Sequence, residues 1–337
     1  MKKGLMIIVS IITLILLGTL IFGAYKYYNL FHRIYDPIPD TGNIQSEQGS
    51  SAISTGKETQ NKDSEPKPFS ILLLGVDARD DEIARSDTII FSTVNPSTKK
   101  ITLLSIPRDT LVTIPERGDD KINHAIVYGG IPLVKSTVEN FLQIPVDHYL
   151  TIDFEAFRRI VDTLDGIEIN VEKRMRYIDP TDGTNIDLRP GLQVLDGKNA
   201  LDYARYRKSN IGPNDSDFAR IDRQHEVIKA VIDKTKNNLS IFTLFKFVDI
   251  MGDHIKTDIS RNQIEDMLKI YRSFSSEDLE ILSLAGEDKV LPYGEYKLYF
   301  YVIDDQEVTR VNEILKKSLQ LDDDLNTNEK NENNSNF

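Results

Sequence analysis

The stretch FSILLLGVDARDDEIARSDTIIFSTVNPSTKKITLLSI, residues 69–106, decides the fold. Its apolar runs Phe69–Val76, Thr88–Val94 and Ile101–Ile106 predict three strands, and the Asn95-Pro96-Ser97 turn predicts a hairpin between the last two. Beyond this stretch, helical periodicity alternates with short apolar runs. This order is typical of an α/β protein, so we expect a three-layer α/β/α domain with a central mixed sheet. The further strands are expected at 148–152, 167–171, 279–284 and 297–303, and the helices at 131–142, 154–164, 196–205, 217–236, 240–252, 260–273 and 306–319.

An uncharged run, LMIIVSIITLILLGTLIFGA, covers Leu5 to Ala24. About 20 helical residues span a hydrocarbon core of roughly 30 Å, so residues 5–25 are predicted to form one N-terminal transmembrane helix, an uncleaved signal-anchor. A cleaved signal peptide is the alternative, but its apolar region is normally shorter and no A-x-A-like cleavage pattern is present. Lys2 and Lys3 beside the initiating amino group favour a cytoplasmic N-terminus. We therefore expect a single-pass protein of the cell membrane with its folded domain on the extracellular face.

The regions that flank the folded domain have a different composition. Residues 26–68 include a stretch rich in Ser, Gly, Pro, Gln and charge, which predicts a flexible extracellular linker. Residues 322–337 form an Asn-rich acidic tail that we expect to be disordered. The predicted organisation is a cytoplasmic N-terminus at 1–4, the membrane helix at 5–25, the linker at 26–68, the catalytic domain at 69–321 and the tail at 322–337.

The overall composition excludes several classes of function. The 337 residues contain 53 Asp and Glu against 41 Lys and Arg, a net charge of −12, with five His and no Cys. Without cysteine there is no disulfide framework, cysteine nucleophile or thiolate metal site. An acidic chain also lacks the basic face that broad nucleic-acid binding needs, and only about four residues are expected in the cytoplasm, too few for a DNA-binding module.

Arginine and aspartate gather in three separated stretches, 75–88, 105–109 and 203–224. The first two follow predicted strands, and loops at strand ends are where α/β folds bind ligands. Six arginines lie near the ends of expected elements: Arg79, Arg85, Arg108, Arg205, Arg207 and Arg223.

The predicted helix over 217–236 carries two polar side chains in its apolar arc. Arg220 and Gln224 lie inside the arc, Arg223 lies on its flank, and His225 is expected on a solvent-exposed flank. A guanidinium that points into a core needs an anionic partner, which a core aspartate or a phosphate can supply. The recurrence of arginines in an acidic chain favours phosphate, to which the planar guanidinium donates two parallel hydrogen bonds.

Asp77 and Asp87 are candidate metal ligands. Mg²⁺ usually takes one or two carboxylates and completes its octahedron with water and phosphate oxygens, so two aspartates among arginines suit a metal-bridged diphosphate. Aspartate also caps turns, and the spacing alone does not decide between the two roles.

Taken together, these motifs resemble the LytR-CpsA-Psr family over roughly Phe69 to Lys236. The resemblance rests on Gly75-x-Asp77-x-Arg79, Arg85-Ser-Asp87-Thr, Ser105-Ile-Pro-Arg108-Asp109, Lys121-Ile-Asn123-x-Ala125, Tyr128-Gly-Gly130, Asp165-Gly166, Ala200-Leu-x-Tyr-x-Arg205-x-Arg207 and Asp217-Phe-x-Arg220-x-x-Arg223-Gln224. Each motif alone is weak, whereas the ordered combination is specific. Members of the family are membrane-anchored enzymes of Gram-positive-type cell envelopes.

The resemblance implies a phosphotransferase of cell wall biogenesis. Such an enzyme moves an anionic glycopolymer, such as wall teichoic acid, from a polyprenyl-diphosphate lipid to a peptidoglycan hydroxyl. By the same resemblance, Asp77 and Asp87 would hold Mg²⁺, or Mn²⁺ in its place. The diphosphate would be bound by Arg79, Arg85, Arg108, Arg205, Arg207, Arg220, Arg223 and Gln224. Arg108 would also stabilise charge in the transition state.

Two questions stay open at the level of sequence. Asp109 is a candidate general base for the acceptor hydroxyl, and its alternative role is to orient Arg108 as an ion pair. The same arginines and aspartates would also serve a Mg²⁺-dependent hydrolase that gives the polymer to water, or a non-catalytic lipid-diphosphate binder that regulates the envelope.

Overall fold

A computed structural model describes residues 25–26, 28–38, 67–76, 86–181, 183–238, 250, 252, 254–270 and 274–321. The predicted membrane helix at 5–25 lies, apart from Tyr25, outside these residues, as does the tail at 322–337. Among the helices of the described residues, none is long and apolar enough to cross a bilayer.

A mixed six-stranded sheet forms the centre of the fold. Its order is β11 (Ile255–Thr257), β6 (His148–Asp153), β1 (Phe69–Val76), β2 (Ser86–Asn95), β3 (Lys100–Ile106) and β12 (Leu279–Leu282). β1 runs parallel to β6 and antiparallel to β2, and β3 runs antiparallel to β2 and parallel to β12. The carboxyl ends of β1, β3, β6 and β12 therefore meet at one edge of the sheet, the edge at which α/β folds bind ligands.

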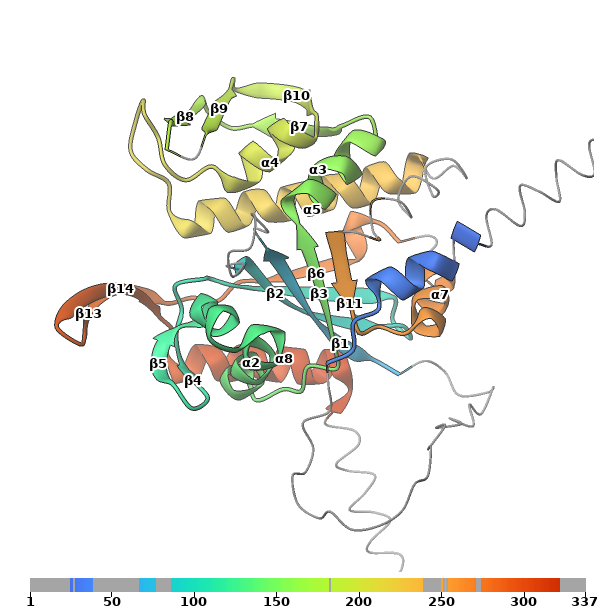
Figure 1. The fold of residues 1–337 in the computed structure, drawn as a ribbon, viewed down its shortest axis with the longest axis horizontal. Coiled ribbons are helices and arrows are strands. Elements are labelled where there is room, and N and C mark those ends of the chain that lie inside the picture. The colour runs from blue at the N-terminus through green and yellow to red at the C-terminus, as the bar shows by residue number, and fades with distance from the viewer. Residues whose placement is uncertain are drawn as a thin grey trace, which may run out of the picture.

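The alternation of side chains along β1 divides the hydrophobic core between the two faces of the sheet. Leu72 and Leu74 pack with α2 (Ala125–Leu142) and α8 (Asp305–Leu319), the helices drawn below the sheet in Figure 1. Ile71 and Leu73 point to the opposite face, toward Ile264 and Met267 of α7 (Arg261–Ile270). A strand buried on both faces reads as a continuous apolar run, as FSILLLGV does.

A second layer with its own core covers the carboxyl edge of the sheet. It consists of α3 (Phe154–Thr163), α4 (Gly197–Arg205) and α5 (Asp217–Asn238), together with the paired strands β7 (Ile167–Val171) and β10 (Gly191–Leu195), and β8 (Met175–Asp179) and β9 (Thr184–Leu188). Figure 1 shows this group above the sheet, opposite α2 and α8. The expected α/β class with a central mixed sheet is confirmed.

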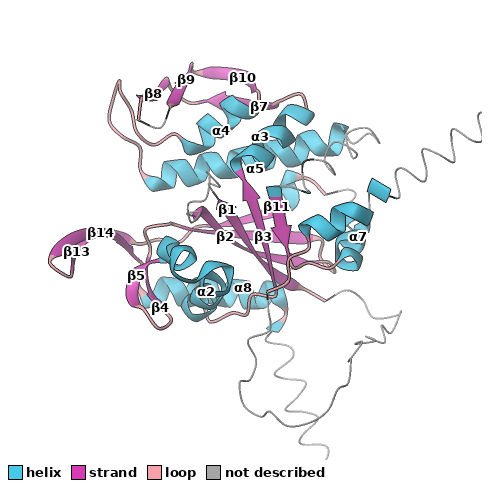
Figure 2. Cartoon of the chain, viewed as in Figure 1, coloured by secondary structure: helices cyan, strands magenta, loops and turns pink. Residues whose placement is uncertain are grey.

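Two further hairpins lie at the side of the sheet. β4 (Leu111–Ile114) pairs with β5 (Gly118–Lys121). β13 (Glu287–Tyr293) pairs with β14 (Tyr296–Val302), and this hairpin projects outward as the β13–β14 arm (Figure 2). Short 3-10 helices occupy Ile122–His124 and Ser276–Asp278. The sequence predicted β14 but not β13, β4, β5, β8, β9, β10 or β11, because these strands are short or largely polar.

The start of the predicted linker is packed against the domain. Residues 28–34 are helical, with Leu30 and Ile34 buried, and Tyr35 bridges Thr257 of β11. The backbone N–H of Asp36 donates to the carbonyl oxygen of Thr257 at 2.9 Å. The expectation of a flexible linker from residue 26 is therefore wrong for residues 28–36, because two apolar side chains and a strand bridge hold this segment on the sheet edge.

Two glycines provide a matched test of the second layer. Gly166 has φ +83° in the turn before β7, and a Cβ there would lie 2.7 Å from Cγ1 of Val194 and 2.8 Å from the carbonyl oxygen of Leu195. Gly183 has φ +75° but open space around it. We expect Gly166→Ala to lower the free energy of unfolding by about 3 kcal/mol, as left-handed strain adds to overpacking. Gly183→Ala should cost about 1 kcal/mol. Equal losses in urea denaturation would contradict the close packing of β10 on this turn.

Candidate functional site

The loop after β3 carries two consecutive charged side chains with separate partners. Nη1 of Arg108 lies 2.7 Å from Oδ1 of Asp87, at the start of β2, and both side chains are partly exposed. Burial lowers the pKa of Arg108, but Asp87 and Asp109 outweigh this effect, so the pKa lies above its ordinary value. The guanidinium is therefore a permanent cation, oriented by Asp87 at the carboxyl edge of the sheet.

Asp109 lies between Arg108 and a second cation. Its Oδ1 accepts a hydrogen bond from Nζ of Lys121 at 2.7 Å, and its Oδ2 lies 3.7 Å from Nε of Arg108. The segment after β5 holds the loop in place, because the backbone N–H of Asn123 donates to the carbonyl oxygen of Arg108 at 3.2 Å. A general base and an ion-pair partner of Arg108, the two roles considered for Asp109, both need a carboxylate close to Arg108. The contact with Lys121 holds the carboxylate in this place.

Arg220, in the first turns of α5, is buried as the helical wheel predicted. Its Nη2 lies 2.9 Å from Oδ1 of Asp217 and 3.4 Å from the carbonyl oxygen of Asp87, which links α5 to β2. Burial lowers the pKa of Arg220, and Asp217 opposes part of that effect. The buried Nε of Arg220 has no hydrogen-bond partner among the described residues. Arg220 also lines the cavity described next, where its guanidinium group is suited to an anionic ligand.

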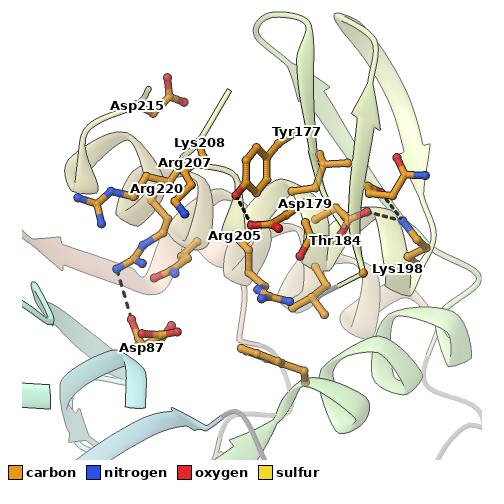
Figure 3. Close-up of a pocket in the computed structure, with 18 of the residues that line it drawn as sticks. Asp87, Tyr177, Asp179, Thr184, Lys198, Arg205, Arg207, Lys208, Asp215 and Arg220 are labelled. Carbon is orange, nitrogen blue, oxygen red and sulfur yellow. Dashed lines mark hydrogen bonds and ion pairs between the residues drawn. The ribbon is translucent and has the colours of Figure 1, made fainter. Parts of the chain in front are cut away.

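A cavity of about 740 Å³ opens between the sheet edge and the second layer. Seven cationic side chains line it, against four carboxylates. The cations are Arg108, Arg158, Lys198, Arg205, Arg207, Lys208 and Arg220. In Figure 3, Arg205 and Arg220 extend from the second layer toward the side of the cavity that carries Asp87. All three stretches rich in arginine and aspartate thus contribute to one cavity with an excess of cationic side chains, which we call the cationic cavity.

Most of the predicted ligand-binding residues that the structure describes line the cationic cavity. Arg205 leaves the end of α4 with its guanidinium carbon 4.6 Å from the centre of the Phe154 ring, a cation–π contact that orients it. Nε of Arg207 lies 4.0 Å from Oδ1 of Asp217, and Gln224 also reaches the cavity. The structure brings Asp87, Arg108, Arg205, Arg207, Arg220 and Gln224 together.

Arg223 points elsewhere. Its guanidinium is buried, with Nη1 3.0 Å from Asp215 and 3.2 Å from Glu172 and with a hydrogen bond to the carbonyl oxygen of Tyr206. It does not line the cationic cavity. Of the two partners considered for a buried arginine, acidic side chains rather than a ligand surround Arg223. Its assignment to the diphosphate stays a prediction, and the geometry favours a structural role.

Three predicted site residues, Asp77, Arg79 and Arg85, lie in the segment 77–85, outside the described residues. Asp87 is the described member of the predicted metal pair, and one of its oxygens is bound to Arg108. Among the described residues, no group of three or more acidic or histidine side chains could hold a metal ion. One carboxylate facing an anion cavity still fits Mg²⁺, which takes few protein ligands when phosphate oxygens are available.

Several residues of the site were missed at the sequence level. Lys121 belongs to the quoted Lys-Ile-Asn motif, yet nothing in the sequence pairs it with Asp109. Arg158 and Lys198 line the cationic cavity because helices α3 and α4 cross close to each other, where a Cβ on Gly197 would lie 2.1 Å from the carbonyl oxygen of Arg158. Lys208 lines it from the loop after α4. Such proximity depends on tertiary packing.

The expectation that His225 is solvent-exposed is wrong. His225 is buried, and its Nε2 lies 2.8 Å from the hydroxyl of Ser105 on β3. The wheel placed it near the edge of the apolar arc, but α5 packs this edge onto the sheet, where Ser105 satisfies the ring.

The chain was compared with known proteins. The model of the LytR_cpsA_psr family matches residues 41–317. The polyisoprenyl-teichoic acid–peptidoglycan teichoic acid transferase TagU of Bacillus licheniformis is 36% identical over 321 residues, which cover 94% of this chain and 97% of that protein. TagT of Bacillus subtilis, with the same transferase description, is 33% identical and matches 96% of this chain and 95% of its own.

Solved structures are similar as well. The crystal structure of Bacillus subtilis TagV has a TM-score of 0.65 at 33% identity and covers 76% of this chain and 99% of that one. A structure of TagT bound to LIIa-WTA has a TM-score of 0.60 at 33% identity and covers 80% of this chain and 100% of that one.

The buried pair of His225 and Ser105 predicts a pH effect on stability. Burial lowers the pKa of His225 below its ordinary value of 6.5. Below pH 6.5 the histidine is protonated more readily in the unfolded chain than in the folded protein. The contribution of the pair to the free energy of unfolding is therefore complete above pH 6.5 and declines as the pH falls. We expect His225→Asn to lose less stability than the wild type between pH 7.5 and 5 in urea unfolding. Parallel curves for the two proteins would contradict a neutral buried histidine.

Proposed function

Because this chain belongs to the LytR_cpsA_psr family, we propose that it is a phosphotransferase of cell wall biogenesis. Its reaction moves an anionic glycopolymer, wall teichoic acid or a similar polymer, from a polyprenyl-diphosphate carrier to peptidoglycan. The named activity of the TagU and TagT relatives supports this proposal. The observation that carries the proposal is the cationic cavity, which Arg108, Arg205 and Arg220 line together.

The chemistry asks for positioning and charge stabilisation more than for covalent work by the protein. Arg205, Arg207, Arg220 and Gln224, which line the cavity, bind the diphosphate oxygens. Arg108 lies at the boundary of the cavity, where Asp87 fixes its orientation. Such a preoriented guanidinium stabilises the charge that builds on the transferred phosphoryl group more than the charge of the ground state.

A divalent cation belongs to the proposal. Asp87, together with Asp77, would hold Mg²⁺ or Mn²⁺ against the diphosphate, and the ion would neutralise charge on the phosphate oxygens. The oxygen of Asp87 that is not bound to Arg108 is the described group that supports this role.

Asp109 is the proposed general base. Its Oδ2 is not used by Lys121, so it can accept the proton of an incoming hydroxyl, while Oδ1 stays in the ion pair. The same carboxylate also helps to orient Arg108, so the two roles that the sequence left open do not exclude each other.

Membrane placement completes the proposal. The apolar run at 5–24 anchors the chain, with the N-terminus inside and the domain on the extracellular face. The helix at 28–34, packed on the domain, leaves only a few residues between the anchor and the folded part. The domain would therefore work close to the bilayer that holds a polyprenyl lipid.

Replacement of the central arginine gives the first functional test. We expect Arg108→Ala to reduce transfer of a lipid-diphosphate-linked glycan to peptidoglycan by about 10²- to 10³-fold, the usual effect of losing one transition-state donor. Arg159→Ala is the control, because Arg159 is exposed and pairs with Glu155 on α3 outside the cavity. Unchanged transfer by Arg108→Ala would refute its role. Free glycan phosphate without attachment to peptidoglycan would instead indicate a hydrolase, and no turnover by the wild type would favour a non-catalytic binder.

Metal dependence is tested separately. We expect EDTA to abolish transfer and added Mg²⁺ or Mn²⁺ to restore it. Asp87→Asn should raise the Mg²⁺ concentration needed for half-maximal activity by about tenfold or more, since a neutral amide binds the ion less strongly. Full activity in EDTA would exclude the metal. If Asp87→Asn needs the same Mg²⁺ concentration as the wild type, Asp87 orients Arg108 and does not bind the metal.

A further inference from the structure

A second cavity, of about 360 Å³, lies on the other side of the loop that carries Arg108 and Asp109. Asp109, Asp217, Phe218, Asp288, Tyr299 and Tyr301 line it, so its character differs from that of the cationic cavity. The two cavities share Arg207, Asn214 and Asp215 in their walls. We call the second one the aromatic cavity.

The lining of the aromatic cavity suits an uncharged or weakly charged saccharide. Phe218 is 37% exposed, and its ring meets Tyr301 edge-on with centroids 5.2 Å apart. Tyr299 donates a hydrogen bond to Asp288. Aromatic side chains offer apolar surface beside a polar group, and ionised carboxylates accept hydrogen bonds from hydroxyl groups. A diphosphate would be repelled by the carboxylates of Asp109, Asp217 and Asp288.

We propose that the aromatic cavity binds the acceptor glycan, so that donor and acceptor approach the Arg108–Asp109 loop from opposite sides. This inference rests on the proposed function. Arg108 lines the donor side and Asp109 the acceptor side. The acceptor hydroxyl oxygen forms a bond to the phosphorus that carries the polymer. The bond between that phosphorus and the bridging oxygen breaks, its electron pair leaves with the polyprenyl phosphate, and the hydroxyl proton passes to Asp109.

The β13–β14 arm extends this site beyond the cavity. In its register Asp288 faces Tyr301 and Val290 faces Tyr299, so these four side chains share one face of the hairpin. Val290 is largely exposed, and the hairpin that carries it projects away from the sheet (Figure 1). On the opposite face, Tyr293 donates to Asp120 at 2.9 Å and anchors the arm to β5. An acceptor that is a long polysaccharide strand needs such a surface more than a closed pocket.

The arm also supplies its own control. Tyr296 is 76% exposed and pairs with Tyr293, so it lies on the face that points away from the proposed groove. Phe218 is half-exposed near the N-terminus of α5, so its truncation leaves the buried core in place.

The test compares full-length Phe218→Ala, Tyr299→Ala and Tyr296→Ala in detergent micelles, with a lipid-diphosphate-linked glycan as donor and uncross-linked peptidoglycan as acceptor. We expect Phe218→Ala and Tyr299→Ala to raise the KM for the acceptor by about five- to tenfold, the size of an aromatic contact. Their KM for the donor should stay within about twofold of the wild type, and Tyr296→Ala should leave both unchanged. An increase in the donor KM alone, or equal effects of all three substitutions, would overturn the proposal.

A second readout separates this proposal from the proposed function. The same proteins are sedimented with peptidoglycan sacculi stripped of teichoic acid, and the bound fraction is measured without any donor. Reduced binding of Phe218→Ala and Tyr299→Ala, but not of Tyr296→Ala, supports the saccharide site even if the wild type transfers nothing. Identical binding of all three variants and the wild type overturns it, whether or not transfer is observed.

Discussion

The structure depends on how one loop gives two adjacent, oppositely charged side chains different main partners. Arg108 and Asp109 follow β3, and Nε of Arg108 lies 3.7 Å from Oδ2 of Asp109. Each has a closer partner on another element, since Asp87 binds Arg108 and Lys121 binds Asp109, both at 2.7 Å. Backbone hydrogen bonds from Asn123 to Arg108 and from Tyr301 to Asp109 hold the loop between β5 and the β13–β14 arm. In this arrangement Arg108 lines the cationic cavity and Asp109 lines the aromatic cavity.

The charge of the protein gives this local arrangement its importance. A chain with a net charge of −12 does not attract an anionic lipid-linked polymer by its overall field. Seven cations in one cavity provide a local positive potential in an otherwise acidic molecule. Aspartates hold several of these cations in place, as Asp217 does for Arg220. The cost of burying such a guanidinium group is offset by these partners.

Much of the fold could be predicted from the sequence, because β1, β2 and β3 are long apolar runs and α3, α4, α5 and α8 have a regular helical period. The strands β8, β9 and β13 could not be predicted, because their exposed and polar residues form strands only when they pair with a neighbouring strand. The clusters of arginine and aspartate predicted the cationic cavity. The individual partners of these arginines could not be predicted. The helical wheel suggested a ligand for Arg223, but Arg223 forms ion pairs with Asp215 and Glu172, which lie in loops that the wheel does not describe. His225 was misplaced for the same reason, because its partner Ser105 lies 120 residues away in sequence.

The central claim is that the cationic cavity binds the diphosphate through guanidinium groups that the fold holds ready. A crystal structure of the protein with a short-chain polyprenyl diphosphate tests it most directly. We expect diphosphate oxygens at about 2.9 Å from guanidinium nitrogens of Arg205 and Arg220, a normal hydrogen-bond distance, with Arg108 facing the same group. A diphosphate located in the aromatic cavity, or one that contacts none of these guanidinium groups, would contradict the claim.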